Sequence, residues 1–276
     1  MFFKSFALAA ILAPVALACP DHSNNKPMPL GKRTTLAEVE GKKEKSDWTY
    51  EASYDWGKVN KDYRMCQIGT HQSPIPLAMG NGLAQSHVPR FDYNGSVKGT
   101  FFNTGYGPGF TVHHEDNDWT RHPSITYDNE TVYLKGLHVH TPADHTVGGH
   151  RSKAEIHFVH VDAEGNEAAV LAIRIDPGQA NNQFFQQLPP MIELDKVGEE
   201  ESCELNLTLA LDAVLHFNEF WTYEGSLTSP PCTEGIRWFV ARQIMFTSVK
   251  EMQDILGASS YSARSEQAVW QHRINV

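Results

Sequence analysis

The sequence has few cysteines, few basic residues and no long apolar run, and each shortage argues against a class of protein. Its four cysteines include no Cys-x-x-Cys pair, which argues against a thiolate metal site. No segment reaches the about 20 apolar residues that a membrane-spanning helix needs. The 23 lysines and arginines are outnumbered by 33 aspartates and glutamates, and the formal charge of −10 argues against nucleic acid or an anionic membrane as a partner. A His-Glu-x-x-His pattern is also absent, which disfavours a metalloprotease of that kind.

Residues 1–18 have the pattern of a secretory signal peptide. One lysine precedes a short apolar run, and Ala16-Leu17-Ala18 before Cys19 matches a small-residue cleavage site. The alternative, a bacterial lipoprotein acylated on Cys19, is weakened because alanine stands at position 16, where such signals usually carry leucine. The sequence therefore predicts a secreted, extracellular protein.

A disordered leader is predicted over residues 19–47, which are rich in Pro, Asn, Lys and Glu and contain few core-forming residues. The pair Lys32-Arg33 within it is either a dibasic processing site, which would make residues 19–33 a propeptide, or a chance pair in a lysine-rich segment. Three N-glycosylation sequons follow, and in a secreted chain they predict a glycosylated surface. They begin at Asn94, Asn129 and Asn206.

Residues 48–276 are expected to form a single domain, because no linker or repeat interrupts them. Short runs rich in β-branched and aromatic residues recur between turn residues, among them VKGTFFNTG, TVYLKGLHVH, AEIHFVHVD and IRWFVARQIMF. Helical patterns are limited to residues 213–221 and to residues 248–256, which begin with a serine cap. These features predict a mainly β, largely antiparallel fold with a few short helices.

Six of the 14 histidines fall within residues 137–160, largely in two predicted strands. Side chains at i and i+2 share a face of a strand, so His138 and His140 point the same way, as do Glu155 and His157 on the next strand. If these strands pair antiparallel, three imidazoles converge on one point. Three neutral imidazoles, with a fourth position left to water, are the ligand set of a catalytic zinc site. Glu155 would then accept a hydrogen bond from the outer N–H of a ligand ring.

The order of the motifs resembles that of the α-class carbonic anhydrases. HVHTPADH, AEIHFVH and WTYEGSLTSPP occur in the order and at the spacing of that family, and the resemblance extends from Trp48 to Trp238. It implies an α-carbonic-anhydrase fold, a large twisted, mostly antiparallel sheet of about ten strands, with one zinc ion per chain. His138, His140 and His157 would hold this ion. The resemblance also implies a carbonate dehydratase, a carbon–oxygen lyase in which zinc-bound hydroxide attacks carbon dioxide and yields bicarbonate and a proton.

The resemblance implies further roles around the metal. Thr228 would orient the nucleophile through a hydrogen bond to a buried carboxylate, here Asp144, and His145 would contribute a hydrogen bond behind the ligands. Cys66 and Cys232 match the disulfide of extracellular members. A dry pocket for the apolar substrate would be lined by Val159, Val170, Leu227, Ser229, Ile236 and Trp238.

Three positions depart from the family pattern. Asp144 stands where glutamate is usual, so its link to the threonine hydroxyl needs a small backbone shift or a bridging water. Tyr106 occupies the proton-transfer position of a histidine, and tyrosine, with an unperturbed pKa of about 10, is a poorer shuttle near neutral pH. His113 or His114 could relay protons instead. Gly136 replaces a glutamine that often orients the first ligand.

The pairing of the two other cysteines stays open. Cys19 and Cys203 pair with each other, bridge two chains, or are separated by cleavage after Arg33, which would leave Cys203 to form a homodimer.

The alternative to an enzyme is a zinc-bearing domain of the same fold that is slow or non-catalytic and serves in binding. The three departures keep this alternative open, whereas the intact histidine set argues against it.

Overall fold

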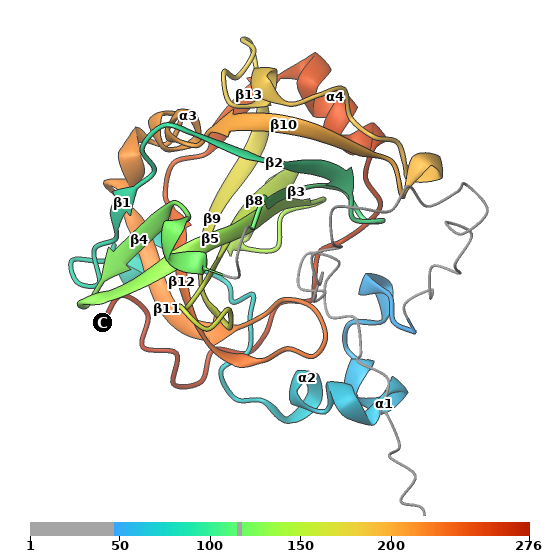
Figure 1. The fold of residues 1–276 in the computed structure, drawn as a ribbon. Coiled ribbons are helices and arrows are strands. Elements are labelled where there is room, and N and C mark those ends of the chain that lie inside the picture. The colour runs from blue at the N-terminus through green and yellow to red at the C-terminus, as the bar shows by residue number, and fades with distance from the viewer. Residues whose placement is uncertain (1–46, 115–117) are drawn as a thin grey trace, which may run out of the picture.

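The computed structural model describes residues 47–114 and 118–276 (Figure 1). The predicted signal peptide and Cys19 lie outside these residues, as does the predicted leader except for its last residue, Asp47. One sheet of 11 strands runs through the domain in the order β10-β2-β3-β5-β8-β9-β12-β11, with β1, β4 and β13 attached beside this path.

The strands of this sheet are β1 (Arg90–Asp92), β2 (Ser96–Asn103), β3 (Pro108–Val112), β4 (Ser124–Tyr127), β5 (Glu130–His140), β8 (Ala154–Val161), β9 (Glu167–Gly178), β10 (Glu200–Asn206), β11 (Phe220–Ser226), β12 (Glu234–Ala241) and β13 (Met245–Ser248). A small separate hairpin consists of β6 (Thr146–Val147) and β7 (His150–Arg151). β12 and β13 pair parallel with β9, and the other strand pairings of the described residues are antiparallel. The predicted fold, a mostly antiparallel sheet of about ten strands, is therefore confirmed.

The central strand β8 is buried along its whole length, and its two faces belong to different environments. Ile156 and Phe158 pack into the larger core, which also takes in Met252 from helix α4 (Val249–Gly257). Val159 lies on the opposite face and packs in a second cluster with Trp238. Alternation along a strand thus separates the larger core from the face that carries Glu155 and His157, as the sequence predicts.

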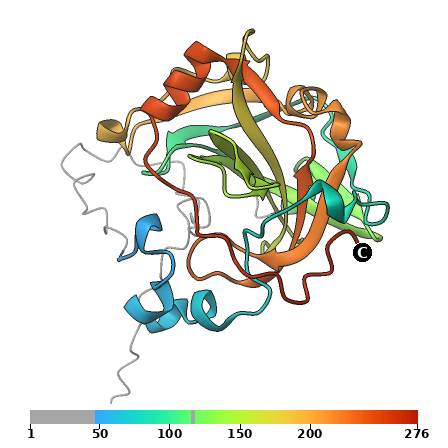
Figure 2. The ribbon, with the colours of Figure 1, turned by 180° about the vertical axis from the view of Figure 1, so that it is seen from behind.

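The helices are few and short. The α-helices besides α4 are α1 (Trp56–Val59), α2 (Met65–Ile68) and α3 (Thr208–Asp212), and the 3-10 turns are η3 (Tyr50–Ala52), η4 (Lys61–Tyr63), η5 (Met79–Asn81), η6 (Trp119–Arg121), η7 (Phe185–Gln187), η8 (Leu194–Lys196) and η9 (Leu215–Phe217). α4 begins as predicted after Ser248, which forms a capping box with Glu251. In Figures 1 and 2, α3 and α4 lie at the same end of the molecule.

The predicted helix over residues 213–221 is wrong. α3 ends at Asp212, and the three residues of η9 have φ between 53° and 56°, a left-handed conformation that cannot continue an α-helix. β11 then begins at Phe220, because Phe220 and Trp221 pair with β12 and bury their rings there. Pairing in the sheet overrides a local pattern that also fits a helix.

None of the helices in residues 47–114 and 118–276 is long and apolar enough to cross a bilayer. Of the three sequon asparagines, Asn94 and Asn129 are exposed, whereas Asn206 is partly buried and its side-chain oxygen accepts hydrogen bonds from Thr208. Glycosylation at these positions stays a prediction.

A buried histidine on the opposite face of β8 from His157 makes the free energy of unfolding depend on pH. His160 is fully buried, its Nε2 lies 2.7 Å from the hydroxyl of Tyr93, and burial lowers its pKa to about 3. An unfolded histidine binds its proton near pH 6.5, so between pH 6.5 and 3 the unfolded state holds more protons and the free energy of unfolding falls as pH falls. We expect this one group to contribute a loss of about 2 kcal/mol between pH 7 and 5.

Urea unfolding of wild type and His160→Gln at both pH values checks this expectation. The variant should lose about 2 kcal/mol less than wild type over this interval, whatever its stability at pH 7. An equal loss in both proteins would show that another group is responsible.

Candidate metal centre

Three histidine rings converge where β5 and β8 pair. His138 lies directly opposite His157 in the antiparallel register, as the sequence pattern predicts, and His140 follows two residues along β5. The Nε2 atoms of His138 and His140 are 2.9 Å apart, and one ring nitrogen from each of the three lies within 4.8 Å of the others. The three side chains are buried, with exposed fractions of 1–5%.

Hydrogen bonds fix the ring tautomers of two of these histidines. Nδ1 of His140 donates to the carbonyl of Ser262 at 2.6 Å, and Nε2 of His157 donates to Glu155 Oε1 at 2.7 Å. Burial lowers the pKa of His140 and, together with the neighbouring His140, lowers that of His157 to about 3. Both rings are therefore neutral at pH 7. The lone pair of His140 is on Nε2, which faces Nε2 of His138, and the lone pair of His157 is on Nδ1. This buried set of imidazole donors fits zinc.

Glu155 lies behind the three rings and is held by a second histidine. Its Oε1 accepts a bond of 2.6 Å from Nδ1 of His145, and its Oε2 accepts one of 2.9 Å from the backbone N–H of the same residue. Burial alone would raise the pKa of Glu155, but His145 and the bond from His157 lower it well below its usual range. Glu155 and His145 thus adjoin the three converging rings, where the sequence predicts them. His145, Glu155 and His157 also form a second potential metal-binding group, but hydrogen bonds already occupy Glu155 and His145.

Asp144 is fully buried, and among the described residues only one of its two carboxylate oxygens has a hydrogen-bond partner. Its Oδ1 accepts a 2.8 Å hydrogen bond from the backbone N–H of Arg264, whereas Oδ2 has no hydrogen-bond partner among the described residues and lies 3.6 Å from Nε2 of His140. No direct hydrogen bond joins Asp144 to Thr228 among these residues. This agrees with the expectation that aspartate, one methylene shorter than glutamate, needs a shift or a bridging water to reach the threonine.

The residues predicted to line a dry pocket lie together beside the rings. Ser229 is buried next to Thr228, and the ring of Trp238 lies 4.9 Å from that of His157. The apolar members form one buried cluster, comprising Val159, Val170, Leu227, Ile236 and Trp238.

Tyr106 belongs to an aromatic group at the N-terminal side of the centre. Its ring stacks on Trp48 at 5.5 Å between centroids, and its hydroxyl donates to the Trp48 carbonyl at 3.3 Å. Tyr50 lies between it and the centre, 4.9 Å from Tyr106 and 5.8 Å from His140. The two alternative proton relays make contacts away from the three rings: His113 contacts Thr100, and His114 stacks on Trp119.

The structure explains the glycine at position 136. The backbone of β3 passes so close that a Cβ atom there would lie 2.4 Å from the carbonyl oxygen of Phe110. Glutamine at this position would force β3 and β5 apart, so the absence of the usual glutamine follows from how tightly these strands approach.

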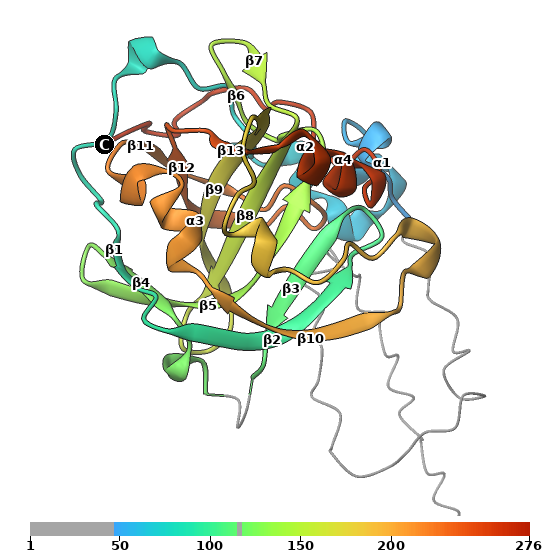
Figure 3. The same ribbon diagram turned by 90° about the horizontal axis from the view of Figure 1, so that it is seen from above.

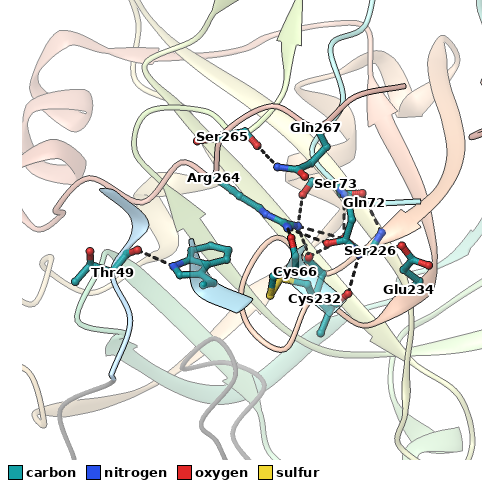
Figure 4. Close-up of a disulfide and its surroundings, with 12 residues drawn as sticks. Thr49, Cys66, Gln72, Ser73, Ser226, Cys232, Glu234, Arg264, Ser265 and Gln267 are labelled. Carbon is teal, nitrogen blue, oxygen red and sulfur yellow. Dashed lines mark hydrogen bonds between the residues drawn. A yellow bond between two sulfur atoms is a disulfide. The ribbon is translucent and has the colours of Figure 1, made fainter. Parts of the chain in front are cut away.

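A disulfide and a buried arginine, Arg264, hold the segment from Ser226 to Cys232: Cys232 forms the disulfide, and Arg264 donates to Ser226 Oγ at 3.4 Å (Figure 4). Thr228 lies within this segment. Cys66 and Cys232 form the predicted bond across 166 positions, with their Cα atoms 5.0 Å apart. Arg264 is fully buried and donates to the carbonyl of Ser73 at 2.7 Å and to Gln72 Oε1 at 2.8 Å, while its backbone N–H holds Asp144. No sequence pattern indicates Arg264, because it lies in an irregular stretch without a motif. Cys203 is a free, partly buried thiol on β10.

The large, mostly antiparallel sheet and the three buried histidines on its middle strands together indicate a metal-binding β-sheet protein. Residues 51–274 match the eukaryotic-type carbonic anhydrase family, so the chain belongs to that family, whose members are carbonate dehydratases. Among curated relatives, alpha carbonic anhydrase 7 of Arabidopsis thaliana is 31% identical over 202 residues, covering 72% of this chain and 70% of the relative.

Solved structures show the same fold. A fungal alpha carbonic anhydrase from Aspergillus oryzae superimposes with a TM-score of 0.69 at 25% identity, covering 78% of this chain and 89% of that one. The alpha carbonic anhydrase of Thermovibrio ammonificans, solved in complex with the inhibitor sulfanilamide, gives 0.67 at 26% identity, covering 79% and 92%. The family that the sequence motifs indicated is thus confirmed.

Proposed function

We propose that the chain catalyses the reversible hydration of carbon dioxide to bicarbonate and a proton, with one zinc ion held by His138, His140 and His157. The observation that carries this proposal is the convergence of three buried rings, two of them locked as neutral tautomers by Ser262 and Glu155. Zinc bound there would supply the Lewis acidity that makes water a nucleophile at neutral pH; carbonic anhydrase is the standard example of this effect.

The remaining roles belong to residues around the triad. Thr228 positions the nucleophile through its hydroxyl, which donates a hydrogen bond to a bridging water that in turn donates to the carboxylate of Asp144. The cluster around Val159 and Trp238 excludes bulk water from the apolar substrate. This pocket comprises Val159, Val170, Leu227, Ser229, Ile236 and Trp238. Tyr106 marks the route by which the released proton leaves.

We propose that the protein is secreted and acts outside the cell. Residues 1–18 act as signal peptide, residues 19–47 form a disordered leader in which Lys32-Arg33 is a candidate processing site, and residues 48–276 form the single catalytic domain. The disulfide between Cys66 and Cys232 supports an oxidising compartment. Pairing of two chains through Cys203 would give a homodimer.

Inhibition by sulfanilamide tests the proposed function, because a related carbonic anhydrase has been solved with this inhibitor bound. We expect it to abolish the hydration of carbon dioxide by the zinc-loaded chain and not to bind the metal-free chain. Zinc-loaded protein that neither binds sulfanilamide nor accelerates hydration would contradict the proposal.

A slow, zinc-bearing domain is the second candidate, favoured by the unpartnered Oδ2 of Asp144. Asp144→Glu separates the two candidates, because the longer side chain reaches toward Thr228 and restores a direct hydrogen bond. A hydrogen bond to a charged group contributes about 1.5–3 kcal/mol, so kcat/KM should rise by about tenfold or more. Stopped-flow hydration checks the rise, with Asp144→Asn as the matched control that keeps the length and removes the charge. A rate lowered equally in both variants would contradict the assigned role.

A further inference from the structure

Two histidines away from the triad face one another at the rim of the sheet, beside the β4–β5 hairpin. His114 follows β3, and His122 follows η6, which lies against the hairpin (Figure 3). Their nearest ring nitrogens, Nδ1 of His114 and Nε2 of His122, are 3.3 Å apart. His122 is anchored at Leu134, four residues before His138 on β5, which corresponds to about 13 Å along the strand. The pair is therefore separate from the triad.

The ring of His122 is held so that a lone pair faces His114. Its Nδ1 lies 2.8 Å from the carbonyl oxygen of Leu134, which can only accept, so this nitrogen carries the hydrogen of the neutral ring. Nε2 then bears the lone pair. A hydrogen bond from the outer nitrogen to a backbone carbonyl is the arrangement that orients metal-binding histidines.

Trp119 fixes both rings. It stacks on His114 with 3.8 Å between centroids and contacts the ring of His122 edge-on at 5.1 Å. Burial lowers the pKa of both histidines, so both are neutral and able to donate lone pairs at pH 7. The neighbouring Asp118 carboxylate, which accepts from Thr120 and pairs with Arg121 at 3.1 Å, adds negative charge beside the pair without being a free ligand.

The separation of the two nitrogens matches a tetrahedral metal. Zn–N bonds of about 2.0–2.1 Å at the tetrahedral angle place two nitrogens about 3.3–3.4 Å apart. A square-planar ion with similar bonds needs about 2.8 Å between neighbouring donors. The observed distance also exceeds the 2.7–3.2 Å typical of N–H hydrogen bonds to oxygen, so a direct bond between the rings would be a long one.

We propose that His114 and His122 form a second, weaker zinc site whose two remaining positions are open to water or a small anion. A cavity of about 500 Å³ adjoins His122 and gives water or a small ligand access to the pair; its charged lining residues are Asp92, Lys98, Asp118 and Arg121. The pair lies outside both three-residue groups found in the described part of the chain, so no third side chain among the described residues completes its coordination. This inference does not depend on the proposed catalytic function.

Isothermal titration of the full, metal-free chain with zinc tests the second site. Wild type should bind one equivalent tightly and a second more weakly, with a change in the fluorescence of Trp119 accompanying the second. His140→Ala should retain only the weaker equivalent, and His122→Asn only the tight one. In His122→Asn the zinc affinity of the rim site should fall at least tenfold, because even the loss of a group that orients a ligand lowers metal affinity by about 10–100-fold. His216→Asn, an exposed histidine on η9 away from this cavity, should behave as wild type.

A second variant guards against a folding defect in His122→Asn. His114→Phe keeps an aromatic ring stacked on Trp119 and removes the donor nitrogen, so it should also lose the weaker equivalent while keeping the wild-type unfolding temperature. Retention of the weaker equivalent in both variants would overturn the proposal and show that the rings only hydrogen-bond to each other.

Discussion

Replacing His140 with alanine is expected to reduce bound zinc from one tightly held ion per chain to a trace, and to lower carbon dioxide hydration by at least about a thousandfold. His140 supplies one of the three buried donors, and its tautomer is fixed by the Ser262 carbonyl. Two rings alone leave a tetrahedral ion with half of its coordination to be filled by water, so the tight site is lost. Metal analysis after gel filtration and stopped-flow hydration on the same sample measure both effects.

His150→Ala is the matched control for this substitution. His150 belongs to the same histidine-rich segment, but it is exposed on β7 and only approaches Asp176, at 3.6 Å. We expect full zinc content and full rate. A His140→Ala protein that keeps zinc and rate would show that the metal, and with it the chemistry, lies elsewhere.

Removing the disulfide should cause the largest change in stability. The bond between Cys66 and Cys232 closes a loop across 166 positions, for which the chain-entropy model gives about 5 kcal/mol of stabilisation. The double variant Cys66→Ser/Cys232→Ser should therefore unfold at much lower denaturant, with a free energy of unfolding lower by about this amount. Its activity should fall as well, because Cys232 lies four residues after Thr228 and ties that loop to the N-terminal helices.

Two comparisons isolate the effect of the bond itself. Cys203→Ser should keep the wild-type free energy of unfolding of the single chain, since Cys203 forms no disulfide within the described part of the chain. A reducing agent should destabilise wild type but leave the double variant unchanged. If wild type and the double variant unfolded at the same denaturant concentration, the account of how this loop is held would be wrong.

The metal centre was predictable because it follows from local geometry. The two-residue period of a strand places His138 and His140 on one face, and a short connection allows β5 and β8 to pair, so the convergence with His157 needs no distant contact. The same period separates Glu155 and His157 from Ile156 and Phe158. Burial of the histidine face against Trp238 and the apolar cluster then depends on β12, far along the chain, and only the family resemblance indicated it.

The features that sequence reasoning missed depend on contacts between distant segments. Arg264 binds groups about 190 residues earlier in the chain, and no spacing rule connects it to Gln72 or Asp144. The wrong helix over residues 213–221 has the same cause, since Phe220 and Trp221 become strand residues only when β12 is present to pair with them. Likewise, whether the second carboxylate oxygen of Asp144 has a hydrogen-bond partner depends on the position of the loop that carries Thr228, and no sequence pattern fixes that position.

Stopped-flow hydration of carbon dioxide between pH 6 and 9, with zinc quantified on the same sample, tests the central claim most directly. The account predicts hydration far faster than in free solution, in proportion to zinc content and saturating at one tightly held ion per chain. A stoichiometric zinc content with hydration no faster than in free solution would contradict the account and leave a zinc-bearing domain with another function.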